Sequence, residues 1–176
     1  MKILLAAALL VSAVLVQVTW APALTVAGAF PNLVLLMVVG VTWIKGVRVG
    51  MAWACAGGVV LDLTAPGPLG PHALALLGGA YVTGFWARNF DQKSFLHPVI
   101  AAVIATGLYC LTLLAADDML GLPVPTFAVA WELAVAAAAY NAAAMLAVLF
   151  TLRVGRPARF AVLTGVPARN ARGEPR

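Results

Sequence analysis

Six long apolar runs, joined by short connections, are the feature that most constrains what this chain can fold into. Hydrophobic residues make up 64% of it and charged residues only 10%, whereas about a quarter of an ordinary soluble domain is charged. A β-barrel would show short segments of alternating hydrophobicity, but these runs are continuous. We therefore predict an all-α, polytopic integral membrane protein, a bundle of six transmembrane helices. The predicted spans are residues 3–20, 28–44, 46–63, 71–87, 95–116 and 127–152.

Three of these spans are close to the minimum length for a complete crossing. A transmembrane helix needs about 17–25 residues, and the second, third and fourth spans are at the short end of that range. The second and third spans could instead form one half-crossing hairpin. The sequence leaves this alternative open.

The eleven lysines and arginines fall on alternate connections. Lys2 precedes the first span, two cations lie within 45–48, two within 88–93, and six arginines follow from residue 153 onward. The other three connections carry none. Because loops rich in Lys and Arg stay on the cytoplasmic side, we predict that both termini are cytoplasmic, which requires an even number of spans.

The predicted domain boundary follows the last span. Residues 1–153 form the transmembrane domain, and residues 154–176 form a basic cytoplasmic tail rich in Pro and Gly. The arginines nearest the membrane could each gain about 1 kcal/mol from anionic lipid, or serve only to fix the topology. Nucleic-acid binding is not expected, because the chain has no basic domain with interleaved aromatic residues.

Small residues recur along one face of the third predicted helix. Gly50, Ala54, Gly58 and Asp62 are spaced by four, so they lie near one face of a helix. A strip of small side chains lets another helix approach closely. We therefore predict a helix-packing or partner-binding seam there, and we include Gly70 in the following loop.

Asp62 is an acid near the carboxyl end of a helix, where it opposes the helix dipole. It should therefore have a partner. The candidates are the Thr64 hydroxyl, the backbone N–H groups of the 64–70 loop, and the start of the fourth span, where His72 is the nearest titratable group. Asp62 would then organise its own turn, although a ligand-binding or proton-linked role stays open.

Two further polar residues lie in the last span. Glu132 is an intramembrane acid beside Trp131, and such acids are functional candidates by default, although an interfacial Glu reaching water is an equal alternative. Asn141 lies nine residues further along. Asp62, His72, Glu132 and Asn141 are the only residues that could line a polar pocket.

No catalytic motif emerges from the sequence. It contains no nucleophile–base pair at recognisable spacing and no HExxH, P-loop or GxGxxG motif. We therefore expect a protein that is not an enzyme and that holds no cofactor or metal.

Several residues between 31 and 90 follow a distinctive pattern. They are Pro31-Asn32-Leu33 at the start of the second span, Gly58, Asp62-Leu63, Pro68-Leu69-Gly70 and Tyr81. This pattern resembles the MreD family, the small polytopic membrane subunits of the bacterial rod-shape system, and the length and composition of the chain are similar as well. The resemblance covers about a third of the chain and includes neither the last span nor the tail.

The resemblance implies a scaffold of the bacterial inner (cytoplasmic) membrane and not a catalyst. MreD-like proteins are accessory subunits of the elongasome that associate with MreC, with RodA and its class B penicillin-binding protein, and indirectly with MreB. They support lateral peptidoglycan synthesis and cell shape. Their fold is similar to the substrate-binding S-components of energy-coupling-factor transporters. A substrate-binding subunit of a small-molecule transporter is therefore the alternative function.

Overall fold

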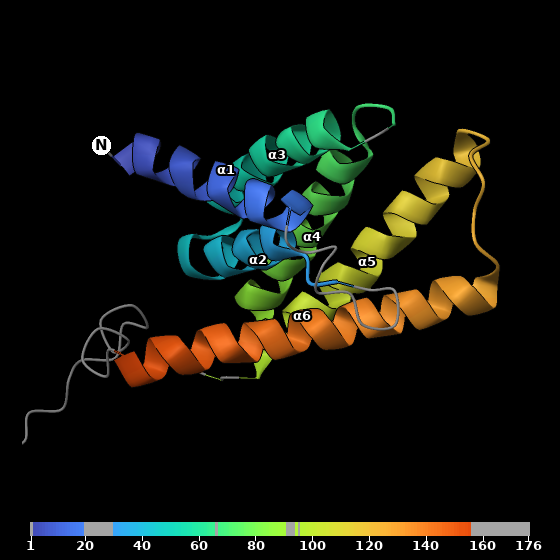
Figure 1. The fold of residues 1–176 in the computed structure, drawn as a ribbon. Coiled ribbons are helices and arrows are strands. Elements are labelled where there is room, and N and C mark those ends of the chain that lie inside the picture. The colour runs from blue at the N-terminus through green and yellow to red at the C-terminus, as the bar shows by residue number, and fades with distance from the viewer. Residues whose placement is uncertain (1, 20–29, 66, 91–93, 95, 156–176) are drawn as a thin grey trace, which may run out of the picture.

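A computed structural model describes residues 2–19, 30–65, 67–90, 94 and 96–155 of the chain. The described residues form six α-helices and no strand (Figure 1). The all-α prediction is therefore confirmed for this part of the chain. The helices are α1 (Lys2–Thr19), α2 (Leu33–Lys45), α3 (Val47–Thr64), α4 (Pro71–Asn89), α5 (His97–Met119) and α6 (Phe127–Gly155).

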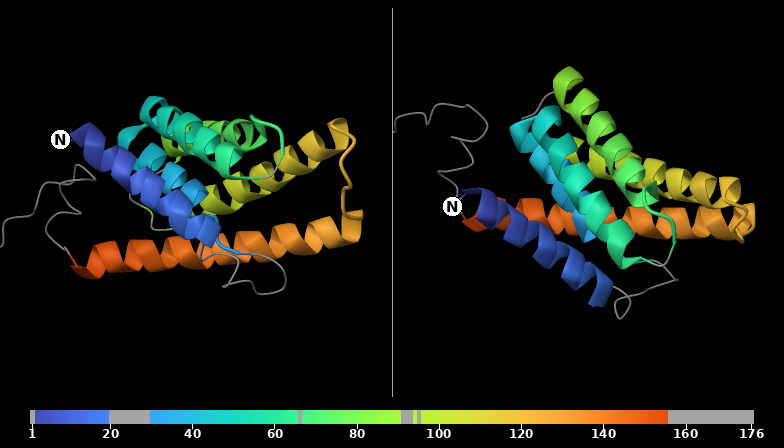
Figure 2. Two further views of the ribbon diagram at one scale, coloured as in Figure 1. Left: turned by 45° about the horizontal axis from the view of Figure 1, so that its top comes forward. Right: turned by 90° about the horizontal axis from the view of Figure 1, so that it is seen from above.

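The short helix α2 is the centre of the fold. It contacts every other helix: α1, α3, α4, α5 and α6. Four of its side chains, Val34, Leu35, Val38 and Val39, have no exposed surface and lie in the hydrophobic core. Helix α4 packs between α3 and α5, and α1 covers α2 and α3. The long α6 crosses α5 at an angle and packs against it (Figures 1 and 2).

Three helices are long and apolar enough to cross a membrane, among the residues described: α3, α5 and residues Phe127–Thr151 of α6. Helix α2 has only 13 residues, so it is about 20 Å long, whereas the hydrocarbon core of a bilayer is about 30 Å thick. The second predicted span begins earlier, at residues 28–29, which lie outside the described residues. The six-span bundle stays a prediction, and α2 is the helix whose length fits it least.

Three described segments that carry or adjoin cations lie at one end of the molecule. The α2–α3 turn, the amino end of α1 and the carboxyl end of α6 lie at this end, whereas the α3–α4 and α5–α6 connections lie at the other (Figures 1 and 2). Helix α6 continues to Gly155, two residues past the predicted boundary. The tail from residue 156, with its predicted lipid contacts, lies outside the described residues.

Candidate functional site

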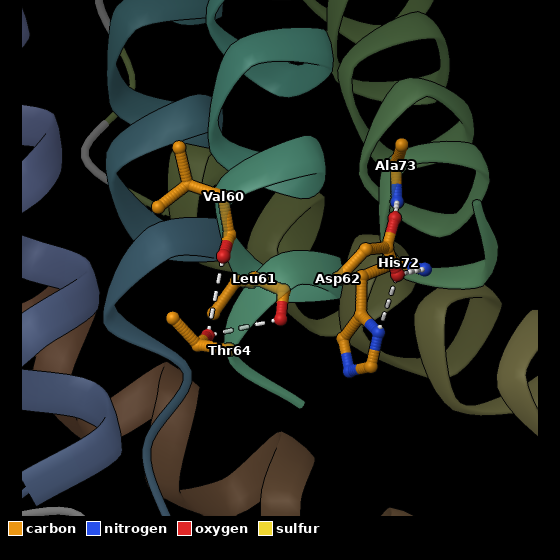
Figure 3. A network of polar contacts seen from close by, with 6 residues as sticks. All are labelled: Val60, Leu61, Asp62, Thr64, His72 and Ala73. Atoms are coloured by element: carbon orange, nitrogen blue, oxygen red, sulfur yellow. Dashed lines mark hydrogen bonds and ion pairs between the residues drawn. The ribbon is translucent and has the colours of Figure 1, made fainter. Parts of the chain in front are cut away.

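The Asp62 carboxylate, at the end of α3, binds the amino end of α4 (Figure 3). Asp62 Oδ1 accepts hydrogen bonds from the His72 backbone N–H at 3.0 Å and from His72 Nδ1 at 2.9 Å. Asp62 Oδ2 accepts one from the Ala73 N–H at 3.2 Å. An ionised carboxylate can only accept, so the His72 tautomer in this pair carries its proton on Nδ1.

This contact replaces a missing helix cap. The first N–H groups of a helix have no partner within the helix, and a side-chain oxygen at the N-cap residue normally accepts from them. The N-cap of α4 is Gly70, which has no side chain to do so. Asp62 supplies the acceptor from the neighbouring helix, and its negative charge lies at the positive end of the α4 dipole.

Burial differs sharply between the two partners. The Asp62 side chain is only 1% exposed, whereas the His72 side chain is 26% exposed. A buried charge needs close partners, because leaving it unpaired is very costly. The three hydrogen bonds meet that need for Asp62, and the His72 ring reaches the surface beside it.

Thr64 is not a partner of Asp62, so this candidate was wrong. Its hydroxyl donates to carbonyl oxygens of its own helix, at 3.2 Å to Val60 and 2.9 Å to Leu61 (Figure 3). The other two candidates, the start of the fourth helix and His72, are the ones that contact the carboxylate. Asp62 therefore joins two helices and does more than stabilise its own turn.

The strip of small residues on α3 packs inside the chain. A Cβ on Gly50 would overlap the Thr42 hydroxyl of α2. A Cβ on Gly58 would overlap the backbone of Ala73 on α4, and Ala54 between them has no exposed surface. This strip is filled by the chain's own helices, so it does not provide a free surface for a partner protein.

Gly70 is not a packing residue of this seam. It is exposed, and a Cβ there would meet no atom within 4 Å. Its φ of +124° is one that residues other than glycine rarely adopt. Gly70 is therefore needed for the conformation of the turn that leads into α4.

A second polar cluster surrounds the amino end of α2. The Asn32 side chain accepts from the Leu35 N–H at 2.9 Å, and Gln17 of α1 accepts from the Val34 N–H at 3.0 Å. Asn141 of α6 accepts from the Asn32 N–H at 2.8 Å. Three helix-start N–H groups are therefore bound by side chains of three different segments.

Asn141 also ties this cluster to α5. Its amide nitrogen donates to the Thr106 hydroxyl at 2.9 Å, and that hydroxyl donates to the Ala102 carbonyl at 2.7 Å. Asn141 has no exposed surface, and Thr106, Gln17 and Asn32 are also buried. Buried polar groups are stable only when hydrogen-bonded, so this network fixes how α1, α5 and α6 meet around α2.

Tyr109 lies between the two clusters. Its ring makes an edge contact with the His72 ring, with 6.1 Å between centroids, and its hydroxyl interacts with the Asn32 side chain. Tyr109 is itself buried. The Asp62 cluster and the α2 cluster are therefore connected through one aromatic side chain.

The four residues predicted to line a polar pocket fall in three places. Asp62 and His72 are in contact, and Asn141 belongs to the second cluster. Glu132 is exposed on α6. Sequence reasoning missed Gln17, Thr106 and Tyr109, and it noted Asn32 only within a motif. The sequence signal that could have identified these residues is that each is a polar residue within an apolar run.

The chemistry open to these clusters is limited. Both oxygens of Asp62 already accept hydrogen bonds from within the chain, which leaves little capacity for a ligand. No group of three His, Cys, Asp or Glu residues that could hold a metal ion occurs in the part of the chain that the structure describes. The geometry therefore favours a structural role for both clusters.

The comparisons with known proteins assign no family to this chain. The chain matches no protein-family model, no curated protein and no solved structure. Its fold is that of a helical protein with three candidate membrane-spanning helices among the described residues. Two buried polar clusters bind the helix ends of this fold.

Proposed function

We propose that this chain is a non-catalytic membrane scaffold, an MreD-like accessory subunit of the bacterial elongasome. The observation that carries the proposal is that residues of the MreD-like pattern make the contacts between helices. Asn32 caps α2, Asp62 caps α4, and Gly58 lets α3 approach α4. The residues on which the resemblance rests thus hold the helices together. This is expected of a scaffold, which acts through its folded structure and performs no chemical reaction.

The proposed location is the bacterial inner membrane, with both termini cytoplasmic. The cation-bearing α2–α3 turn, the amino end of α1 and the carboxyl end of α6 lie at one end of the fold (Figure 1), which supports this topology. The apolar composition and the three long apolar helices support the membrane location.

Cysteine labelling tests the topology. In a background with Cys55 and Cys110 replaced by Ala, we expect Pro68→Cys to react with a membrane-impermeant maleimide in intact cells stripped of outer membrane. Lys45→Cys should react only after permeabilisation. Both positions are exposed in the structure, so access to the reagent depends on the membrane alone. The reverse pattern would refute the proposed orientation.

The partners proposed are MreC, RodA with its class B penicillin-binding protein, and indirectly MreB. Because the α3 strip is filled internally, these partners must contact outer faces. Helix α6 offers the longest outer face, because only 11% of its most apolar 18-residue stretch is buried inside the structure. Its exposed side chains include Trp131, Val135 and Phe150.

Co-purification and rescue of cell shape test this function. We expect the tagged chain, extracted from its host in mild detergent, to retain MreC or the RodA pair, and its depletion to round the cells. A tagged multi-pass protein of unrelated function, expressed at the same level, is the control. The proposal would be refuted if the cells stayed rod-shaped after depletion and the folded protein retained none of these partners.

The same pull-down discriminates the transporter-subunit alternative. A substrate-binding subunit needs a pocket with a few convergent polar groups, whereas Asp62 and Asn141 are each engaged by helix-start N–H groups. Recovery of an ATPase cassette in place of the cell-shape proteins would favour that alternative.

A further inference from the structure

A groove lies at the end of the molecule that carries the α2–α3 turn. It has a volume of about 360 Å³ and is lined by the turn itself and by the last part of α4. Lys45 and Arg48 flank the single-residue turn at Gly46, and Arg88 comes from α4. All three cations are exposed, so a concave surface of this chain gathers three positive charges from two segments.

These charges have no acidic partner among the residues that the structure describes. The acid–base contact found in that part of the chain is the hydrogen bond between Asp62 and His72, which belongs to the α3–α4 connection at the other end. Like charges held around one hollow repel one another. An anion in the groove would relieve that repulsion.

A second groove adjoins the first and has an apolar wall. Its volume is about 320 Å³, and it shares Val47, Gly84 and Arg88 with the basic groove. Tyr81 and Phe85 add exposed aromatic surface along α4, at 61% and 60% exposure. The combined surface is basic at the end of the fold and apolar along the helix.

The floor of this surface depends on Gly84. A Cβ there would lie 2.6 Å from Val47 Cβ, so α4 touches the start of α3 because residue 84 has no side chain. This contact brings Arg88 to the same hollow as Lys45 and Arg48. The arrangement of the three cations is therefore built into the helix packing.

We propose that the two grooves together bind one anionic phospholipid. Its phosphate lies among Lys45, Arg48 and Arg88, and an acyl chain runs over Tyr81 and Phe85. The proposal rests on the membrane location proposed above, which brings this end to the cytoplasmic leaflet, where basic segments attract anionic lipid. It does not depend on which proteins the chain binds.

Native mass spectrometry of the purified full chain in detergent tests this site. We expect phosphatidylglycerol to remain bound where phosphatidylcholine does not. Replacing Lys45, Arg48 or Arg88 with Gln should weaken phosphatidylglycerol binding about fivefold for each cation removed. Phe85→Ser should weaken it as well. Thermal unfolding should be unchanged, because these side chains are exposed.

Arg88→Lys is the matched control, because it keeps the positive charge at a position that lines both grooves. We expect it to leave phosphatidylglycerol binding unchanged. Equal retention of phosphatidylcholine, a loss in Arg88→Lys equal to that in Arg88→Gln, or unchanged binding in the three groove variants would overturn the proposal. Displacement of the lipid by equimolar glycerol 3-phosphate would also overturn it, since the site would then take a soluble phosphate. None of these outcomes would alter the co-purification result, so the two proposals fail separately.

Discussion

Placing a single methyl group on Gly58 is expected to force α3 away from α4 and to remove much of the folded protein. In Gly58→Ala the new Cβ would lie 2.6 Å from the Ala73 nitrogen and 2.8 Å from Ala73 Cβ, and it would overlap Ala73 Cα. Backbone atoms cannot rotate out of the way as a side chain does. Overpacking of this kind typically costs about 1–3 kcal/mol, and Gly58→Leu should cost more.

Gly107 in α5 is the matched control, because a Cβ there would meet no atom within 4 Å. Replacing an interior helix glycine with alanine gains about 0.8–1 kcal/mol from helix propensity. Gly107→Ala should therefore raise the thermal midpoint of the detergent-solubilised protein, whereas Gly58→Ala lowers it. Fluorescence-detected size exclusion after heating measures both. Midpoints that move in the same direction would argue against the α3–α4 seam.

Periodicity and hydropathy located most helices well. The spans predicted at 46–63 and 71–87 are the helices Val47–Thr64 and Pro71–Asn89, because Gly and Pro at their ends interrupt the pattern. The spacing of four also indicated a close approach along α3. It could not indicate which helix fills the strip, because α2 meets Gly50 and α4 meets Gly58.

The start of α2 was less predictable. The apolar run begins at residue 28, but the helix begins at Leu33, after its cap at Asn32. Hydropathy describes side chains, whereas a helix begins where its first N–H groups find acceptors. Here those acceptors include Gln17 and Asn141, which lie 17 and 109 residues away from their partners along the chain. No local pattern encodes contacts at such separations.

Asp62 was predicted to need a partner, and the choice among partners required the structure. A hydroxyl two residues away is near in sequence, but Thr64 already donates to carbonyls of its own helix. The amino end of α4 offers N–H donors, and a helix dipole whose positive end faces the acid. A carboxylate is best bound by several donors at once, so the α4 terminus is the stronger partner.

Asp62→Leu is expected to destabilise the fold severely. It removes the acceptor for the backbone N–H groups of His72 and Ala73. Each buried donor left unpaired costs about 1–3 kcal/mol, and the charge–dipole attraction contributes up to about 2 kcal/mol more in buried geometry. Since whole domains are stable by only about 5–15 kcal/mol, we expect little folded protein to remain.

Asp62→Asn should be intermediate, which separates a structural carboxylate from a chemical one. An amide keeps one oxygen to accept from His72, but its NH₂ group would face the Ala73 N–H, so one bond is lost and two donors meet. His72→Ala removes only the imidazole bond and keeps both backbone bonds, so it should be mild. We therefore expect membrane protein levels to fall in the order His72→Ala, Asp62→Asn, Asp62→Leu, with rescue of cell shape falling in step. Loss of rescue in Asp62→Asn at a normal level of folded protein would mean that the charge of Asp62 itself is needed for function.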